Sequence, residues 1–126
     1  MTPAAIGGDL SNRLQLFVPE GDRESTSVPV DLQDRWAVHL LDRCGDLFGG
    51  ATSYDRGIGV WRDERGRKHW DRVVVIEAWV DPSTPRLKAK LMSLWRGLES
   101  MRVELRQRVV GCLYNGRWTS YRERSS

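Results

Sequence analysis

"HWDRVVVIEAWV", residues 69–80, is the stretch that decides the fold, because its two alternating sets of side chains differ in chemistry. Successive side chains of a β-strand point to opposite faces of a sheet. One set is wholly aliphatic and consists of Val74, Ile76, Ala78 and Val80. The other set includes a carboxylate and an indole and consists of Val73, Val75, Glu77 and Trp79. The stretch therefore predicts a strand with one face packed under helices and a second face of different chemistry.

Periodicity predicts the elements on either side of this stretch. Residues 13–19, 57–63 and 108–114 read as strands, and Asn115-Gly116 is a favoured hairpin turn before a last strand at 117–121. Apolar residues recur every three or four positions at 32–47 and 87–105, which predicts two helices. The order β-α-β-β-α-β with an added C-terminal strand is the ferredoxin-like, split βαβ arrangement. It is an α+β fold with two helices on one face of an antiparallel sheet.

Length and composition indicate one globular domain. The chain has 126 residues, of which 40% are hydrophobic and 29% are charged, as in ordinary folded proteins. We expect one domain over residues 13–121, with tails at 1–12 and 122–126. No apolar run reaches the ~20 residues that cross a bilayer, and the N-terminal residues lack the pattern of a secretory signal. The expected location is the cytoplasm, and no membrane is expected as a partner.

Charge is distributed unevenly along the chain. From Arg86 onward ten Lys/Arg stand against three Asp/Glu, whereas residues 1–85 hold ten against fourteen. A basic C-terminal half is typical of nucleic-acid binding and also of solvated helices. The strand at 69–80 argues against an RNA-recognition module, because it lacks the basic-Gly-aromatic run of those modules and Glu77 would repel phosphate.

The sheet face away from the helices is predicted to be apolar enough to need a cover. Alternation places on it the side chains of Phe17, Trp61, Val75 and Trp79. The residues expected to face the helices from the first two strands are Leu14, Leu16, Val18, Ile58 and Val60. Four covers remain open: a second copy packed sheet on sheet, as in dimeric α+β barrels, a nucleic-acid strand, a small ligand, or a folded-over segment of the chain itself.

Few residues stand out as candidates for chemistry. Glu77 lies inside an apolar strand, where an unpaired buried carboxylate is costly. It is expected to pair with an arginine such as Arg62, to face water, or to act as an acid or base. His69 is a candidate general base, although the sequence has no catalytic triad spacing, phosphate-binding loop or metal-binding motif. Cys44 and Cys112 are expected to be buried free thiols, and no cofactor or metal is expected.

A glycine-rich segment, "FGGATSYDRGIGVW", occupies residues 48–61. It is either a plain connection from helix to strand or a loop around a ligand, and it lacks the G-x-G-x-x-G spacing of dinucleotide-binding loops. Its polar residues Tyr54, Asp55 and Arg56 are the ones expected at a cleft. Together with the valine-rich strand that carries Glu77, the segment resembles small uncharacterised bacterial and mobile-element proteins of predicted ferredoxin-like fold. The resemblance implies the fold and brings no activity.

These features favour a non-catalytic binding protein that self-associates through its open sheet face, with a dimer expected first, as a component of a larger bacterial or mobile-element system. The residues expected to meet a partner or ligand are Phe17, Trp61, Glu77, Trp79, Tyr54, Asp55, Arg56, Arg62 and His69. The alternative is a small-ligand-binding protein or enzyme of the dimeric α+β barrel type, with Glu77, His69, Tyr54 and Arg62 near a pocket. A second alternative is a nucleic-acid-binding module that uses the basic C-terminal half.

Overall fold

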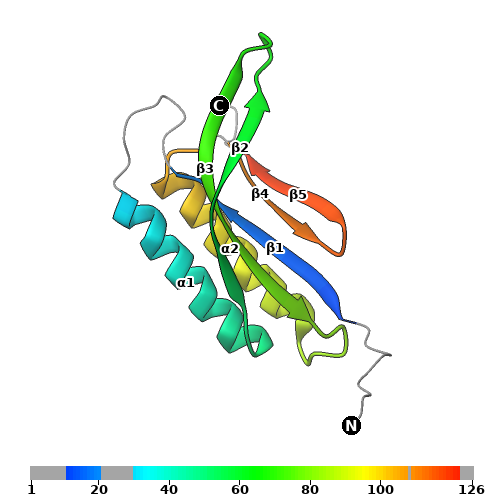
Figure 1. Ribbon diagram of the computed structural model, residues 1–126. Coiled ribbons are helices and arrows are strands. Elements are labelled where there is room, and N and C mark those ends of the chain that lie inside the picture. Colours follow the sequence, from blue (N-terminus) through cyan, green and yellow to red (C-terminus); the bar gives the residue numbers. More distant parts are fainter. Residues whose placement is uncertain (1–10, 21–29, 108, 123–126) are drawn as a thin grey trace.

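The computed structural model describes residues 11–20, 30–107 and 109–122. Within these ranges the elements, in chain order, are β1 (Asn12–Val18), α1 (Val30–Phe48), β2 (Thr52–Arg62), β3 (Lys68–Val80), α2 (Leu87–Glu104), β4 (Val109–Tyr114) and β5 (Arg117–Arg122) (Figure 1). The strands form one sheet in the order β2-β3-β1-β4-β5, and each neighbouring pair is antiparallel. This is the strand order of the split βαβ arrangement with β5 added beside β4. The predicted α+β fold is confirmed.

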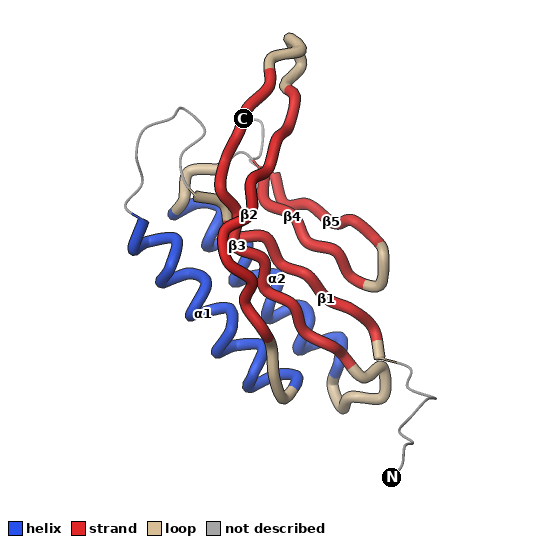
Figure 2. Tube along the Cα trace, in the orientation of Figure 1, coloured by secondary structure: helices blue, strands red, loops and turns tan. Residues whose placement is uncertain are grey.

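Helices α1 and α2 lie next to each other on one face of the sheet, as Figure 2 shows. The sheet residues beneath them are the aliphatic set expected from alternation, and all are buried: Leu14, Leu16, Val18, Val74, Ile76, Ala78 and Val80. They meet the apolar stripes of the two helices, which include Leu40, Cys44, Leu94, Leu98, Met101 and Leu105. Neither helix, within the described ranges, is long and apolar enough to cross a membrane.

Both cysteines are buried free thiols, as expected. Burial raises the pKa of the Cys44 and Cys112 thiols to about 11, because the charged thiolate is poorly solvated among apolar side chains.

A left-handed residue stands at one boundary of each helix. Helix α1 runs through Gly45 to Phe48 and is followed by Gly49 at φ 93°, a left-handed conformation that glycine adopts without strain. Helix α2 starts at Leu87 with Arg86 at φ 57° as its N-cap. Ser83 donates its backbone N–H and its hydroxyl to Asp81 Oδ1 in the turn that precedes α2.

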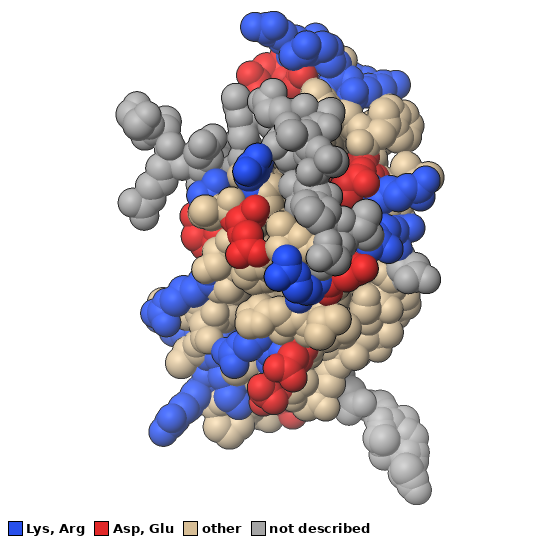
Figure 3. Space-filling view, turned by 90° about the vertical axis from the view of Figure 1, so that its left-hand side faces the viewer, with Lys and Arg blue, Asp and Glu red and all other residues tan. Residues whose placement is uncertain are grey.

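The hairpin of β2 and β3 extends well beyond the helices (Figures 1 and 2). We call residues 57–73 the arm and the remainder of the fold the body. The strand β1 pairs with residues 74–80 of β3 and with no earlier residue of that strand, so the arm is a two-stranded ribbon. Lys and Arg gather at its far end (Figure 3).

The arm corrects one expectation about burial. Ile58 and Val60 pair with Arg72 and Trp70, on the face that continues the buried row of the body. They were expected to lie under the helices, yet they are 67% and 51% exposed. The alternation is right, but the helices stop short of the arm, so nothing in the described part of the chain covers these side chains.

Gln33 of α1 fastens the base of the arm to the body. Its buried amide Nε2 donates to the backbone carbonyls of Val18 (3.0 Å) and Arg72 (2.9 Å), and its Oε1 accepts from Arg56 Nε (2.8 Å). Arg56 also forms an ion pair with Asp34 of α1. The pairing register shifts between Tyr54 and Gly57, and this β-bulge re-aims the side chains around it. Arg56 is thereby turned toward α1.

Candidate functional site

Glu77 lies at the centre of the open face, which we define as the sheet face opposite the helices. It is only 8% exposed and is surrounded by donors from two neighbouring strands. Its Oε2 accepts from Arg13 Nε (2.6 Å) and from Gln15 Nε2 (3.2 Å), and its Oε1 accepts from the Tyr54 hydroxyl (3.3 Å). Arg13 Nη2 completes an ion pair at 2.6 Å. A buried carboxylate is tolerated where opposite charge and hydrogen bonds replace its lost hydration.

The pairing partner of Glu77 differs from the expected one. An arginine was expected to neutralise it, and Arg62 was the candidate. The register of the β2–β3 hairpin places Thr52 opposite Glu77 and Arg62 opposite Lys68, at the far end of the arm. Arg13 of β1 takes the role instead, because β1 is the other neighbour of β3.

The two carboxylate oxygens of Glu77 accept different numbers of hydrogen bonds. Oε2 holds the arginine and the glutamine, whereas Oε1 accepts a single long bond from Tyr54 among the described residues. An ionised carboxylate oxygen has about two acceptor sites. Oε1 therefore has room for one further donor or for a cation approaching from the open face.

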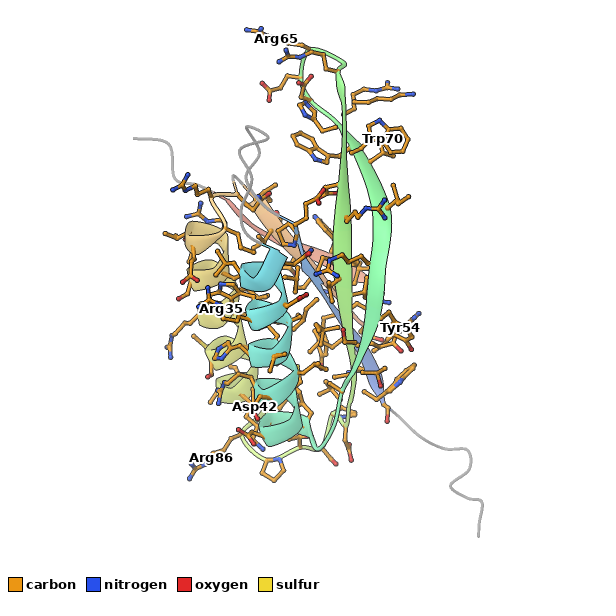
Figure 4. All side chains as sticks on the ribbon, turned by 60° about the vertical axis from the view of Figure 1, so that its left-hand side comes forward. Arg35, Asp42, Tyr54, Arg65, Trp70 and Arg86 are labelled. Atoms are coloured by element: carbon orange, nitrogen blue, oxygen red, sulfur yellow. The ribbon has the colours of Figure 1, made fainter. Side chains whose placement is uncertain are left out.

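Tyr54 is exposed and lies on the side of the sheet away from α1, whereas Arg35 and Asp42 project from the helical side (Figure 4). It sits opposite Val75, immediately before the bulge. The phenol hydroxyl thus closes over Glu77 from the neighbouring strand while its ring stays accessible to a ligand.

Aromatic rings flank the Glu77 cluster on the same face. Trp79 is exposed and lies under the Arg13 guanidinium, 6.0 Å from the ring centroid, within the range of a cation–π contact. On the other side, Phe17 and Trp118 have ring centroids 5.9 Å apart. Trp118 was not singled out from the sequence. The Asn-Gly turn sets the register Leu113↔Trp118, so alternation through β1 and β4 could have placed it on this face.

The structure separates the predicted site residues into three groups. Phe17, Tyr54, Glu77 and Trp79 share the open face of the body. Trp61, Arg62 and His69 lie on the arm. Arg56 faces α1, and the side chain of Asp55 lies outside the described part of the structure. Of the expected cluster, the structure brings Glu77 and Tyr54 together and places His69 and Arg62 on the arm.

The arm carries a polar cluster of its own. The His69 ring stacks on Trp61 with centroids 4.3 Å apart, and its Nε2 lies 2.9 Å from Asp63 Oδ2. Asp63 also accepts from the backbone N–H groups of Arg65 and Arg67 at the hairpin turn. The bond with His69 and these amides hold the pKa of the Asp63 carboxyl well below its usual range. The cluster closes the turn, so its histidine is engaged in holding the arm together.

Comparison with known proteins identifies the fold but no family. No family model and no curated protein matches the chain. Among solved structures, it is similar to a phage SAM lyase in complex with S-methyl-5′-thioadenosine, with a TM-score of 0.61 and 15% sequence identity over 92% of each chain. A phage SAM lyase in the apo state gives a TM-score of 0.61 and 18% identity, covering 100% of this chain and 98% of the other. At these identities the likeness shows the fold. It also agrees, at the level of a small phage protein, with the resemblance to mobile-element proteins.

These likenesses contradict the favoured functional hypothesis. A non-catalytic protein that self-associates through its open face was expected, whereas the similar structures are those of an enzyme, one with a small ligand bound. The alternative of a small-ligand-binding protein or enzyme fits better.

Proposed function

We propose that this protein is an enzyme that binds S-adenosylmethionine, or a closely related sulfonium nucleoside, on its open sheet face and releases S-methyl-5′-thioadenosine. The observation that carries the proposal is the shielded carboxylate of Glu77, with one under-occupied oxygen, among exposed aromatic rings. A carboxylate oxygen with room for a further contact, next to aromatic rings, is a suitable environment for a sulfonium cation. Further support comes from the fold, which is similar along nearly the whole chain to that of a SAM lyase.

The bond to be broken follows from the two molecules. S-adenosylmethionine carries a positive sulfur bonded to three carbons, and S-methyl-5′-thioadenosine is what remains when the four-carbon amino-acid chain departs. The carbon–sulfur electron pair stays on sulfur, which becomes a neutral thioether. The four-carbon fragment balances the reaction either by losing a proton and becoming an alkene or by closing its own carboxylate onto the departing carbon. On both routes the positive charge on sulfur decreases in the transition state and is absent from the thioether product.

The side chains of the open face have complementary parts in this scheme. Glu77 Oε1 is the atom we assign to contact with the sulfonium, and Arg13, Gln15 and Tyr54 hold the carboxylate in place. Trp79 is an exposed indole next to the carboxylate, with the Arg13 guanidinium over one face of its ring. Where the fragment leaves as an alkene, Glu77 Oε1 is the acceptor we assign to the proton. Where it leaves as a lactone, Glu77 only orients the cation.

The test is direct measurement of the reaction. Purified protein is incubated with S-adenosylmethionine, and S-methyl-5′-thioadenosine is quantified by chromatography with mass spectrometry. Glu77→Gln preserves the shape and the acceptor oxygen but removes the charge, and we expect at least about a 100-fold loss of rate. Arg62→Gln removes a charge at the far end of the arm and should leave the rate unchanged. Failure of the unmodified protein to release S-methyl-5′-thioadenosine would overturn the proposal.

The expected homo-oligomer needs a different surface under this proposal, since the ligand occupies the open face. The exposed side chains of Ile58, Val60 and Trp70 on the arm are the apolar surface we assign to contact between copies. Sedimentation velocity of the protein and of Ile58→Ser with Trp70→Ser tests this assignment. An unchanged sedimentation coefficient in the double variant would contradict it. The single domain and the cytoplasmic location remain predictions.

A further inference from the structure

We infer that Trp118, seated flat on Gly111, is the platform on which the purine ring of the ligand stacks. This inference rests on the proposed function, because it assigns the nucleoside end of the ligand whose sulfonium end meets Glu77. It concerns a residue that none of the interactions around Glu77 involves.

The first observation is how closely the indole lies on the sheet. A Cβ atom built on Gly111 would stand 2.1 Å from both Cη2 and Cζ2 of Trp118, and 3.0 Å from Cε2. Only a residue without a side chain permits this approach. One face of the Trp118 ring is thus pressed onto the backbone of β4, and yet the residue is 60% exposed. The opposite face of the indole is available to a ligand.

The second observation is the position of the ring relative to Glu77. Glu77, Gln15, Leu113 and Trp118 follow one another across β3, β1, β4 and β5 as directly paired residues. Neighbouring strands lie about 4.8 Å apart and the rise along a strand is about 3.4 Å per residue, so Gly111 beneath the Trp118 ring, two strands across and two residues along from Glu77, is roughly 12 Å away. In an adenosyl thioether a ribose separates the purine from the sulfur. The nucleoside can therefore span from the indole to the carboxylate along the sheet.

The third observation is the composition of the surface between the two ends. Phe17 lies beside Trp118, with its ring tilted by 45°, and is half-buried. Together the two rings form an apolar corner on an otherwise accessible face. Purine rings stack well on such aromatic surfaces, and stacking supplies affinity without reading hydrogen-bonding edges. A flat nitrogen heterocycle fits this corner better than an aliphatic chain or a charged group.

A purely structural role for Trp118 makes a different prediction. Cross-strand aromatic residues cover glycines in sheets and stabilise the pairing. On that reading, loss of the indole would lower stability and leave the affinity for a nucleoside unchanged. The two roles are separable because the covering uses one face of the ring and the stacking uses the other.

The experiment measures binding of adenosine and of S-methyl-5′-thioadenosine by isothermal titration calorimetry, with thermal melting as the control for folding. We expect Trp118→Ala to weaken both affinities by about tenfold or more and Trp118→Phe to retain most of the affinity. Gly111→Ala should weaken both by displacing the ring. Met92→Ala, which removes an exposed apolar side chain from α2 on the far side of the sheet, should leave both unchanged. If Gly111→Ala does not fold, the affinities of Trp118→Phe and Trp118→Ala alone decide whether the aromatic ring is needed for binding.

The outcomes distinguish this inference from the proposed function. If S-adenosylmethionine is cleaved and Trp118→Ala has unchanged affinities, the platform is wrong and the function stands. If adenosine binds through Trp118 and S-adenosylmethionine is not cleaved, the platform stands and the function is wrong. If the unmodified protein binds neither nucleoside, the platform is overturned.

Discussion

The body and the arm share one strand, β3, and the same alternation of side chains. The side chains on the helix-facing side of β3 are buried only in the body. Residues 74–80 have β1 beside them and the helices beneath them, and their aliphatic set is buried. In residues 68–73 the same alternation continues past the end of β1, and Trp70 is exposed. The difference teaches that a pattern sets which side chains share a face, whereas burial depends on what lies opposite that face.

The sharpest test of this difference is to shorten one side chain in the body and one on the arm and to compare the two losses of stability. Leu98 is fully buried in α2 beneath the sheet, and Leu98→Ala should lower the free energy of unfolding by about 2–5 kcal/mol, through lost burial and the cavity left behind. Ile58→Ala on the arm should change it by less than about 0.5 kcal/mol at protein concentrations low enough to keep the chain monomeric. Urea denaturation followed by circular dichroism measures both. Equal losses would show that the arm is packed within the single chain.

Gln33 joins the two regions, so its removal should loosen one of them selectively. Gln33→Leu leaves the carbonyls of Val18 and Arg72 without their donor, and we expect a loss of about 1–3 kcal/mol. Amide hydrogen exchange should rise more in the arm than in residues 74–80. The control is Asp34→Asn, which removes only the exposed partner of Arg56 and should cost less than about 1 kcal/mol. Uniform exchange across both regions would contradict a tether.

The turn of the arm should lose stability in acid. The pKa of Asp63 is lower in the folded chain than in the unfolded one, so its contribution to stability is complete above its unfolded-state pKa. That contribution is lost as the pH falls through the folded-state value. We expect the amides of Arg65 and Arg67, which bond to this carboxylate, to lose exchange protection at low pH. Asp63→Asn should abolish the pH dependence, and its persistence in that variant would assign it to another group.

The smallest effects are expected from two glycines. Gly97 lies in α2 with open space where a Cβ would be placed, so Gly97→Ala should raise stability by about 0.5–1 kcal/mol. Gly66 at the tip of the arm has φ 79°, which an alanine adopts only with strain. Gly66→Ala should therefore destabilise the turn. Thermal melting of the two variants gives the signs, and a stabilising Gly66→Ala would mean that the turn differs in solution.

The candidate site shows how far local patterns reach. That Phe17, Glu77 and Trp79 share a face followed from alternation alone. The ion-pair partner of Glu77 could not be predicted in this way. Choosing Arg13 over Arg62 requires knowing that β1 lies beside Glu77 and that Arg62 lies at the far end of the arm. Trp118 was missed for a related reason. The local hairpin sets its place over Gly111, but its place on the same face as Glu77 depends on β4 pairing with β1.

The sequence by itself determined the element order, the helix-facing set of β1 and β3, and the α+β class, because these depend on periodicities that span a few neighbouring residues. The tertiary structure alone decided the bulge that turns Arg56 toward α1, the distance by which the arm extends beyond the helices, and the assembly of hydrogen-bond donors around Glu77. Each of these arises from contacts between residues distant in the chain. Many registers satisfy the same local pattern, and only the packed fold selects one of them.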